Sequence, residues 1–504
     1  MKKIITLFAF SLLFISCTDD NIIEEPILEP IVYTSGTANF SKFVSVGNSL
    51  TAGYSDGALF EEGQKNSLPV MLAGNFRLAG GGDFKVPLMA DNLGGLTLGG
   101  VPLAGFGNRL VLSFRNAVGG ARPSPTPVAG VGKTEVSTRV AGPFNNMGIP
   151  GAKSFHFVAP GYGNVAALPN ANPFFIRMAS SANATVLADA ISQSPTFFSL
   201  WIGNNDVLGY ATQGGAGADH NQTGNLNPAT YGPNDITNNN TFASIFNSIL
   251  QAMTAKGAGG IVANIPNVTT IPYFRTVPHN PIPLDAATAG FLNSAAAYGA
   301  YNAGLAQLNG FGLLSNDELA KRRITFAAGP ANAVVIIDED LTNLTGFNPA
   351  LINMRQATAS DLIVLPAQSI IGTLANPSVP TSINGVAVPL ADRWVLTPQE
   401  QASVATAIAG YNQTIAALAA QYNVALVDVN AYLNRVATSG VSLPDGSRAT
   451  ATYATGGAFS LDGVHPSPRG YALIANEFTK VINTKYGSNL PNVNPLDFKG
   501  LYIK

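Results

Sequence analysis

The sequence contains a single cysteine, Cys17, among its 504 residues, which excludes an internal disulfide. Charged residues make up only 11% of the chain, the net charge is −2, and no basic cluster follows the first few residues. Nothing in this composition supports nucleic-acid binding. The glycine run 80–82 lacks the lysine and the preceding strand of a phosphate-binding loop. Because no His, Cys or Asp cluster has metal-ligand spacing, we expect no catalytic metal and no cofactor.

The N-terminus has the features of an export signal. Lys2 and Lys3 precede an apolar run over residues 4–15, which is too short to span a bilayer. The pair Ser16-Cys17 resembles the cleavage box of bacterial lipoproteins. We therefore predict a signal peptide over residues 1–16 and lipidation of Cys17. Ordinary signal-peptide cleavage that leaves a spare thiol is the alternative.

The residues after Cys17 indicate a tether. Asp19 and Asp20 are followed by a stretch rich in Glu and Pro, and we expect residues 17–38 to link a lipid anchor to a folded domain. Acidic residues directly after the cysteine resemble the surface-export signals of some Gram-negative lipoproteins, and a generic acidic linker has the same composition. The expected location is the bacterial outer membrane, on its periplasmic or surface face.

Four short segments, spread between residues 47 and 466, carry the residues of an acyl-transfer site. Each lies beside a strand-like run, and their combination is much more specific than any one of them. The segments are Gly47-Asn48-Ser49-Leu50, Asn146-Met147-Gly148-Ile149-Pro150-Gly151, Gly203-Asn204-Asn205-Asp206 and Asp462-Gly463-Val464-His465-Pro466.

Together these segments supply a nucleophile, a base, an acid and hydrogen-bond donors. The Ser49 hydroxyl needs a base to take its proton, and His465 is the natural candidate, since imidazole is the side-chain group that ordinarily titrates near neutral pH. Asp462, three residues earlier, can reach the histidine ring through a turn and fix its tautomer. The backbone N–H groups of Ser49 and Gly151 and the side-chain amide of Asn205 are candidate donors to an oxyanion.

Each residue also has a simpler interpretation. Taken alone, Ser49 is a turn residue, Asn205 is a cap, and Gly151 is a position that needs backbone freedom. We expect Asp206 to hold its loop. The other three histidines lack a nearby motif and are expected to be surface or packing residues; they are His156, His220 and His279.

Apolar runs alternate with helical segments, which predicts a parallel sheet between helical layers. The expected strands cover residues 42–46, 196–202, 260–265, 334–337 and 424–429. The expected helices cover residues 286–308, 397–422 and 467–486. Thr397 and Glu400 have capping-box spacing around Pro398, which supports the second helix. Ser49 follows the first strand, at the sheet edge where α/β folds keep their sites.

With these motifs, the chain resembles the SGNH hydrolases of the GDSL esterase/lipase family. The resemblance covers roughly residues 40–486, and Asn264-Ile265-Pro266-Asn267-Val268-Thr269 also resembles a loop of bacterial members. It implies a three-layer α/β/α sandwich with a parallel sheet, of flavodoxin-like type. It also implies Ser49, His465 and Asp462 as the catalytic triad, with Ser49, Gly151 and Asn205 as the oxyanion hole. Asn48 replaces the usual aspartate of the nucleophile block; asparagine can accept the same hydrogen bond but lacks the charge.

The motif order predicts a single domain over residues 39–490, with a tail over residues 491–504. Three segments do not fit the expected core and are taken as insertions, favoured as lids or walls around the site, with surface decoration as the alternative. They cover residues 55–145, 209–240 and 339–393.

The expected activity is hydrolysis of carboxylic esters through an acyl-serine. The expected substrate is a lipid or another acyl ester. Two alternatives stay open: an O-deacetylase that acts on polysaccharide, and a non-catalytic surface lipoprotein that keeps the fold. Asn48 favours the last of these, whereas the intact Ser49, Asp462 and His465 argue against it.

Overall fold

The computed structural model describes residues 31–117 and 120–503. The signal peptide predicted over residues 1–16, Cys17 and most of the linker predicted over residues 17–38 lie outside the described residues. Among the described residues, no helix has both the length and the apolarity needed to cross a membrane.

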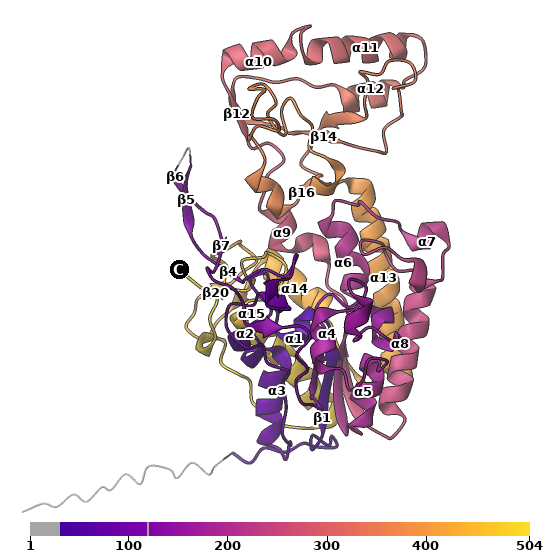
Figure 1. Cartoon of the computed structure of the whole chain (residues 1–504), viewed down its shortest axis with the longest axis vertical. Coiled ribbons are helices and arrows are strands. Elements are labelled where there is room, and N and C mark those ends of the chain that lie inside the picture. The colour runs from indigo at the N-terminus through magenta and orange to yellow at the C-terminus, as the bar shows by residue number, and fades with distance from the viewer. Residues whose placement is uncertain (1–30, 118–119, 504) are drawn as a thin grey trace, which may run out of the picture.

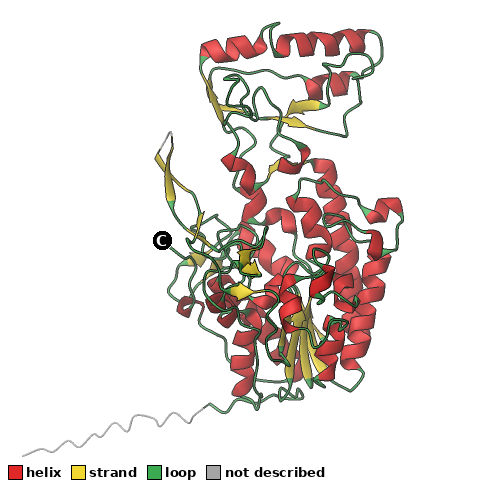
Figure 2. Cartoon of the chain, in the orientation of Figure 1, coloured by secondary structure: helices red, strands yellow, loops and turns green. Residues whose placement is uncertain are grey.

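A five-stranded parallel sheet forms the centre of the larger lobe, with helices on both of its sides (Figures 1 and 2). Its strands are β1 (Phe43–Gly47), β9 (Asn146–Gly148), β10 (Phe197–Trp201), β11 (Gly259–Ala263) and β18 (Ala425–Val427). Every residue of β1 and β10 is buried, which explains their nearly continuous apolar sequence. The predicted α/β class and parallel sheet are therefore confirmed.

The strand order is β18-β11-β10-β1-β9. From β1 the chain crosses to one side of the sheet to form β9, and then returns to the other side of β1 to form β10. The order therefore reverses between β1 and β10. In open parallel sheets, the crevice beyond the carboxyl ends of the strands at such a switch point is where ligands bind.

Helices cover the sheet, and their start signals are visible in the sequence. Helix α13 begins at Pro398 and carries the predicted capping box between Thr397 and Glu400. Helix α3 packs against α15, and α8 packs against α13. The helices of this lobe are α1 (Ser49–Ala52), α2 (Glu61–Lys65), α3 (Leu68–Arg77), α4 (Pro173–Met178), α5 (Val186–Ser192), α6 (Asn205–Thr212), α7 (His220–Thr223), α8 (Asn239–Thr254), α9 (Pro272–Arg275), α13 (Pro398–Gln421), α14 (Val429–Thr438) and α15 (Pro468–Tyr486).

A second lobe stands beyond α6 and α9 and contains the stretch from β12 to β15 (Figure 1). Its elements are β12 (Ile282–Leu284), α10 (Ala286–Asn293), α11 (Tyr298–Gly310), α12 (Asn316–Arg322), β13 (Gly329–Asn332), β14 (Val335–Ile337) and β15 (Met354–Gln356). The pair β16 (Leu362–Ile363) and β17 (Val395–Leu396) lies at its base. The predicted insertion 339–393 thus forms only the later part of a lobe that begins much earlier in the chain.

Two predictions within this lobe are wrong. Residues 334–337 do not join the central sheet, because β14 pairs antiparallel with β15. Val334, Val335 and Ile336 are fully buried in the core of the second lobe, which accounts for the apolar run. Residues 286–308 form two helices, since the chain turns at Ser294, whose N–H and hydroxyl both donate to the Phe291 carbonyl. Helix propensity was high on both sides of this turn and therefore did not reveal it.

The segment predicted as the first insertion, residues 55–145, contributes two core helices, α2 and α3. Phe76 of α3 stacks on Phe40 with ring centroids 4.0 Å apart, next to Phe197 of the sheet. The rest of the segment forms short strands: β2 (Leu96–Leu98), β3 (Val101–Pro102), β4 (Leu110–Val111), β5 (Phe114–Ala117), β6 (Gly120–Pro123), β7 (Thr126–Pro127) and β8 (Thr134–Glu135). Later in the chain, β19 (Val441–Ser442) and β20 (Arg448–Ala449) form a hairpin that precedes the segment with Asp462 and His465.

Candidate active site

Ser49 is the first residue of α1 and follows strand β1 of the five-stranded sheet, with only Asn48 between them. The Asn48 side chain caps this helix by accepting from the Leu50 N–H at 3.1 Å, and it donates to Asn204 Oδ1 at 3.4 Å. Asn48 therefore makes the capping contact that a carboxylate would make, and its amide adds a link to the loop after β10. As the first helical residue, Ser49 has no helical partner for its own N–H.

The loop before α15 brings His465 and Asp462 to the serine. His465 Nε2 lies 2.8 Å from Ser49 Oγ, and His465 Nδ1 lies 2.8 Å from Asp462 Oδ2. The structure thus places the predicted nucleophile, base and acid in one line of hydrogen bonds. The serine and the histidine are 416 positions apart in the chain.

The aspartate is held as an acceptor. Its Oδ1 accepts from the N–H groups of Val464 at 2.8 Å and His465 at 2.9 Å, and its Oδ2 accepts from the Gly57 N–H at 3.0 Å. Burial raises the pKa of Asp462, but the nearby His465 and these hydrogen bonds outweigh burial and lower the pKa to about 2. A carboxylate only accepts, so His465 Nδ1 carries the proton and Nε2 is free to accept the Ser49 proton.

A second carboxyl group, Asp56, lies behind the triad and was not predicted. It is buried, with a left-handed backbone (φ 52°), and its Oδ1 accepts from the Leu461 N–H at 2.9 Å. Its own N–H donates to Ser460 Oγ, which in turn donates to Asp462 Oδ1 at 3.0 Å. Burial, reinforced by the charge of Asp462, raises the pKa of Asp56 to about 7.

Tyr54 was also missed by the sequence reasoning. Its ring lies over the His465 imidazole with centroids 4.7 Å apart, and its hydroxyl donates to the Gly57 carbonyl at 2.6 Å. The Asp56-Gly57 pair signals a turn in the sequence, but nothing there indicates that the turn supports a loop about 400 residues away. Tyr54 and Asp56 therefore position the triad from behind, and the Tyr54 N–H also donates to the Ser49 carbonyl at 3.1 Å.

Besides the Ser49 N–H, the candidate oxyanion donors come from the segments after β9 and β10. Asn205 shares a cavity with Ser49 and His465, and its amide nitrogen donates to the Ala152 carbonyl at 2.9 Å. One N–H of this amide is thus held, which fixes the side chain, and the other remains available. Gly151 has a left-handed φ of 80°, and a side chain there would meet nothing within 4 Å. Gly151 does not line the cavity beside Ser49.

Asp206 ties these two loops together. Asp206 is fully buried, and its carboxylate accepts from both the N–H and the hydroxyl of Ser154, at 2.8 and 2.6 Å. The loop that contains Gly151 is therefore fixed relative to α6, which begins with Asn205. The structure agrees with a holding role for Asp206. The remaining histidines lie elsewhere: His156 stacks on Tyr162, and His220 contacts Asp235.

The cavity beside Ser49 has a volume of about 40 Å³. A single water needs about 10–15 Å³ on this measure, so the enclosed space suits only a small group. Most of its walls are apolar, which favours a hydrocarbon or methyl group over a charged one. The lining residues other than Ser49, Asn205 and His465 are Leu50, Trp201, Asn204, Leu208, Pro266, Val268, Ile271, Leu433, Phe459, Val464 and Pro466.

Compared with protein-family models and with curated proteins, the sequence gives no match.

Proposed function

We propose that this chain is a serine hydrolase that cleaves carboxylic esters. The observation that carries the proposal is the continuous hydrogen-bonded line from Ser49 through His465 to an ionised Asp462. The fold we propose is the three-layer α/β/α sandwich of the SGNH hydrolases. Numbered along the chain, the sheet order is 2-1-3-4-5, the order of flavodoxin-like folds. Ser49 and Asn205 follow β1 and β10, the two strands at its switch point.

The proposed reaction has two steps. In the first, Ser49 Oγ attacks the ester carbonyl while His465 Nε2 takes the hydroxyl proton, and the carbonyl oxygen becomes an oxyanion. The His465 proton then passes to the departing alcohol, which leaves an acyl-serine. In the second step, His465 takes a proton from water, the hydroxide attacks the acyl-serine, and Ser49 regains its proton as the carboxylic acid is released. Asp462 stabilises the imidazolium in both steps.

Three donors are proposed for the oxyanion: the backbone N–H groups of Ser49 and Gly151 and the Asn205 amide. Support comes from the helix start at Ser49 and from the fixed Asn205 side chain. The Gly151 N–H also donates no hydrogen bond within the described part of the chain. Donors of this kind act mainly on charge that develops in the transition state.

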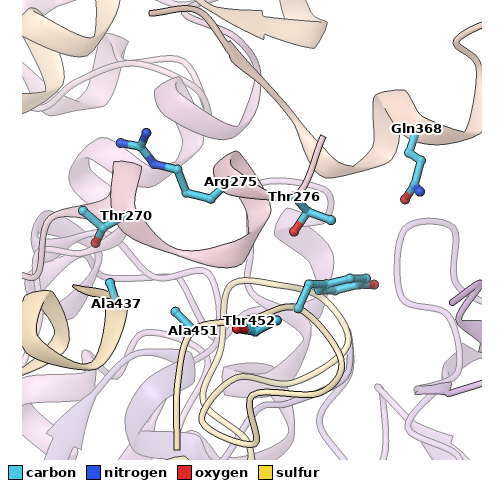
Figure 3. Close-up of a pocket in the computed structure, with 8 residues that line it drawn as sticks. Thr270, Arg275, Thr276, Gln368, Ala437, Ala451 and Thr452 are labelled. Atoms are coloured by element: carbon cyan, nitrogen blue, oxygen red, sulfur yellow. The ribbon is translucent and has the colours of Figure 1, made fainter. Parts of the chain in front are cut away.

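A second candidate, O-deacetylation of a polysaccharide, is favoured by the contrast between two neighbouring cavities. The 3-10 helix η4 (Val268–Thr270) contributes Val268 to the small cavity and Thr270 to a cleft of about 510 Å³ (Figure 3). The wide cleft is bordered by polar side chains, among them Arg275, Gln368 and Thr452. A small acyl pocket near a roomy cleft that carries several polar side chains suits an acetyl group on a hydrophilic alcohol.

The N-terminal leader and the cellular location of the protein are also part of the proposal. The leader and Cys17 support an outer-membrane lipoprotein that faces the periplasm or the outside, with an acyl ester of a lipid or carbohydrate as substrate. A non-catalytic binding lipoprotein with the same fold is the competing class.

One experiment separates these functions. The purified protein is assayed on nitrophenyl esters of increasing acyl length, with Ser49→Ala as the inactive control. Ser248→Ala removes an exposed helical hydroxyl that bonds only to the Ser244 carbonyl, and it should keep wild-type activity. A maximum at acetate supports the deacetylase, and a maximum at longer chains supports the lipase. Turnover no higher than that of Ser49→Ala on every ester would overturn the enzyme proposal in favour of a binding protein.

A further inference from the structure

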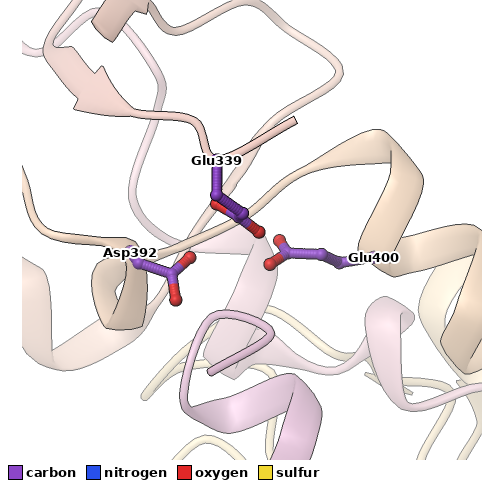
Figure 4. Close-up of side chains that lie close together, drawn as sticks. All are labelled: Glu339, Asp392 and Glu400. Atoms are coloured by element: carbon purple, nitrogen blue, oxygen red, sulfur yellow. The ribbon is translucent and has the colours of Figure 1, made fainter. Parts of the chain in front are cut away.

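Three carboxyl groups, two of them from residues 392–400 and one from residue 339, converge where the two lobes meet (Figure 4). One oxygen from each of Glu339, Asp392 and Glu400 lies within 4.8 Å of the others. Glu339 follows β14 of the second lobe, Asp392 opens the 3-10 helix η6 (Asp392–Trp394), and Glu400 lies in the first turn of α13. These residues are remote from the triad in the chain and have no role in the proposed mechanism.

The most buried of the three points an unpartnered oxygen into the cluster. Glu400 is only 4% exposed, and its Oε2 accepts from the N–H and the hydroxyl of Thr397. Its Oε1 is buried without a hydrogen-bond partner in the described structure, and the same holds for Asp392 Oδ1. Figure 4 shows the Glu400 carboxyl directed toward that of Glu339. Buried carboxylate oxygens without a donor are costly, so this arrangement requires a positively charged partner or a proton.

The neighbouring acids disfavour ionisation of the cluster. Burial raises the pKa of both Asp392 and Glu400, and Glu339 raises both further through its charge and a side-chain hydrogen bond to each; Asp338 and Asp340 add to the effect on Asp392.

The nearby cations are already engaged. Lys321 and Arg355 both contact Asp338, and Arg355 also forms a two-bond pair with Asp361. Arg393, next to Asp392 in the chain, lies over the Trp394 ring. The three carboxyl groups therefore share a space in which the described side chains supply no compensating charge.

We propose that Glu339, Asp392 and Glu400 bind a divalent cation, with Ca²⁺ as the preferred ion. Ca²⁺ takes oxygen ligands at about 2.3–2.6 Å, so two ligands on opposite sides of the ion lie about 5 Å apart, which accommodates the observed spacing. The site offers no histidine or cysteine, which disfavours zinc, and Mg²⁺ needs a stricter octahedron.

The turn after α6 closes the site from the core side. A side chain at Gly215 would place its first carbon 1.7 Å from Glu400 Oε1, so only glycine fits there, and its φ of 84° also favours glycine. The bound ion joins the second lobe, through Glu339, to the start of α13 through Glu400, beside the turn at Gly215. This role is structural and does not depend on the proposed esterase activity.

The test measures binding and stability. The purified protein is stripped with EGTA and titrated with CaCl₂ by calorimetry, and its thermal midpoint is recorded with and without about 5 mM CaCl₂, above the range of about 0.1–1 mM typical of extracellular Ca²⁺ modules. We expect one Ca²⁺ per chain and a midpoint raised by a few degrees, because the ion binds only the folded state. MgCl₂ at the same concentration should give a smaller shift.

Two variants and one control assign the site. Glu339→Gln changes an exposed residue and should fold normally, yet lose the calcium response. Glu400→Gln should also lose the response, and it should stabilise the stripped protein, because it removes like-charge repulsion. Asp340→Asn removes a neighbouring charge outside the cluster and should keep stoichiometric binding. A wild-type protein that shows neither heat nor a midpoint shift with Ca²⁺ would overturn the proposal and show that the carboxyl groups share protons instead. If Asp340→Asn and Glu339→Gln lose the calcium response equally, the response depends only on the local negative charge, and the proposed site is overturned as well.

Discussion

Asn205→Ala is the sharpest test of how the site stabilises charge. The side chain lines the cavity beside Ser49, and one N–H of its amide is held by the Ala152 carbonyl at 2.9 Å. Truncation therefore removes a preorganised donor and leaves the nucleophile and the base in place. Loss of one such donor costs about 3–4 kcal/mol in the transition state, which lowers kcat by roughly 100- to 1000-fold. KM should change much less, because the donor acts on charge that develops during the reaction.

The same substitution should have a small effect on stability. It removes one side-chain hydrogen bond, worth about 1 kcal/mol, and it leaves the Asp206 contacts with Ser154 intact. Asn66→Ala is a matched control, since Asn66 is also half-buried and its amide donates to the Glu62 carbonyl at 3.0 Å, away from the cavity.

The assay compares kcat, KM and the denaturation midpoint of both variants with those of the wild type, on the best nitrophenyl ester. Asn66→Ala should lose a similar amount of stability and no activity. A folded Asn205→Ala protein with wild-type kcat would refute the oxyanion role of Asn205 and weaken the proposed SGNH assignment.

Three further predictions concern residues around the triad and the N-terminus. Asn48→Asp should keep or raise kcat, because an aspartate can accept from the Leu50 N–H as the asparagine does. A loss of activity as complete as that of Ser49→Ala would show that Asn48 does more than cap the helix. Burial raises the pKa of Asp56 to about 7, so between about pH 4 and 7 the unfolded chain has lost this proton while the folded protein keeps it, and the contribution of Asp56 to stability should fall over this range. Asp56→Asn should remove this contribution and gain up to about 4 kcal/mol over the wild type at pH 8, measured by urea unfolding, whereas parallel pH profiles of the two proteins would contradict it. A fatty-acid probe in cells should label the wild type and not Cys17→Ala, and equal labelling would exclude lipidation at this cysteine.

The fold class and the parallel sheet were predictable because they depend on strong local patterns. The runs in β1, β10 and β11 are almost entirely apolar, and α13 carries both a capping box and a proline at its start. Strand β9 was missed, since Asn146-Met147-Gly148 is short and contains residues that are rare in strands. Residues 334–337 were misplaced, because an apolar run signals burial and does not say in which lobe it is buried.

The candidate site was predictable in part, for a related reason. Ser49, His465 and Asp462 stand in short motifs whose residue types fit one reaction, and the structure brings them into hydrogen-bond contact. Tyr54 and Asp56 had no such signal, because their roles depend on a contact with a loop that is distant in the chain. The cluster of Glu339, Asp392 and Glu400 was missed too, since its members have no common spacing and meet only through the packing of two lobes.

The separation between Ser49 and His465 has a consequence for how the protein acquires its chemistry. Their contact closes a loop of more than 400 residues, so it is among the most entropically demanding contacts to form. Chain that has been synthesised only as far as β18 holds the nucleophile and the oxyanion loops but no base. Under the proposed mechanism, a partly made or partly folded chain would be inert toward esters, and hydrolytic activity would report that the α15 end of the chain has docked on the β1 end.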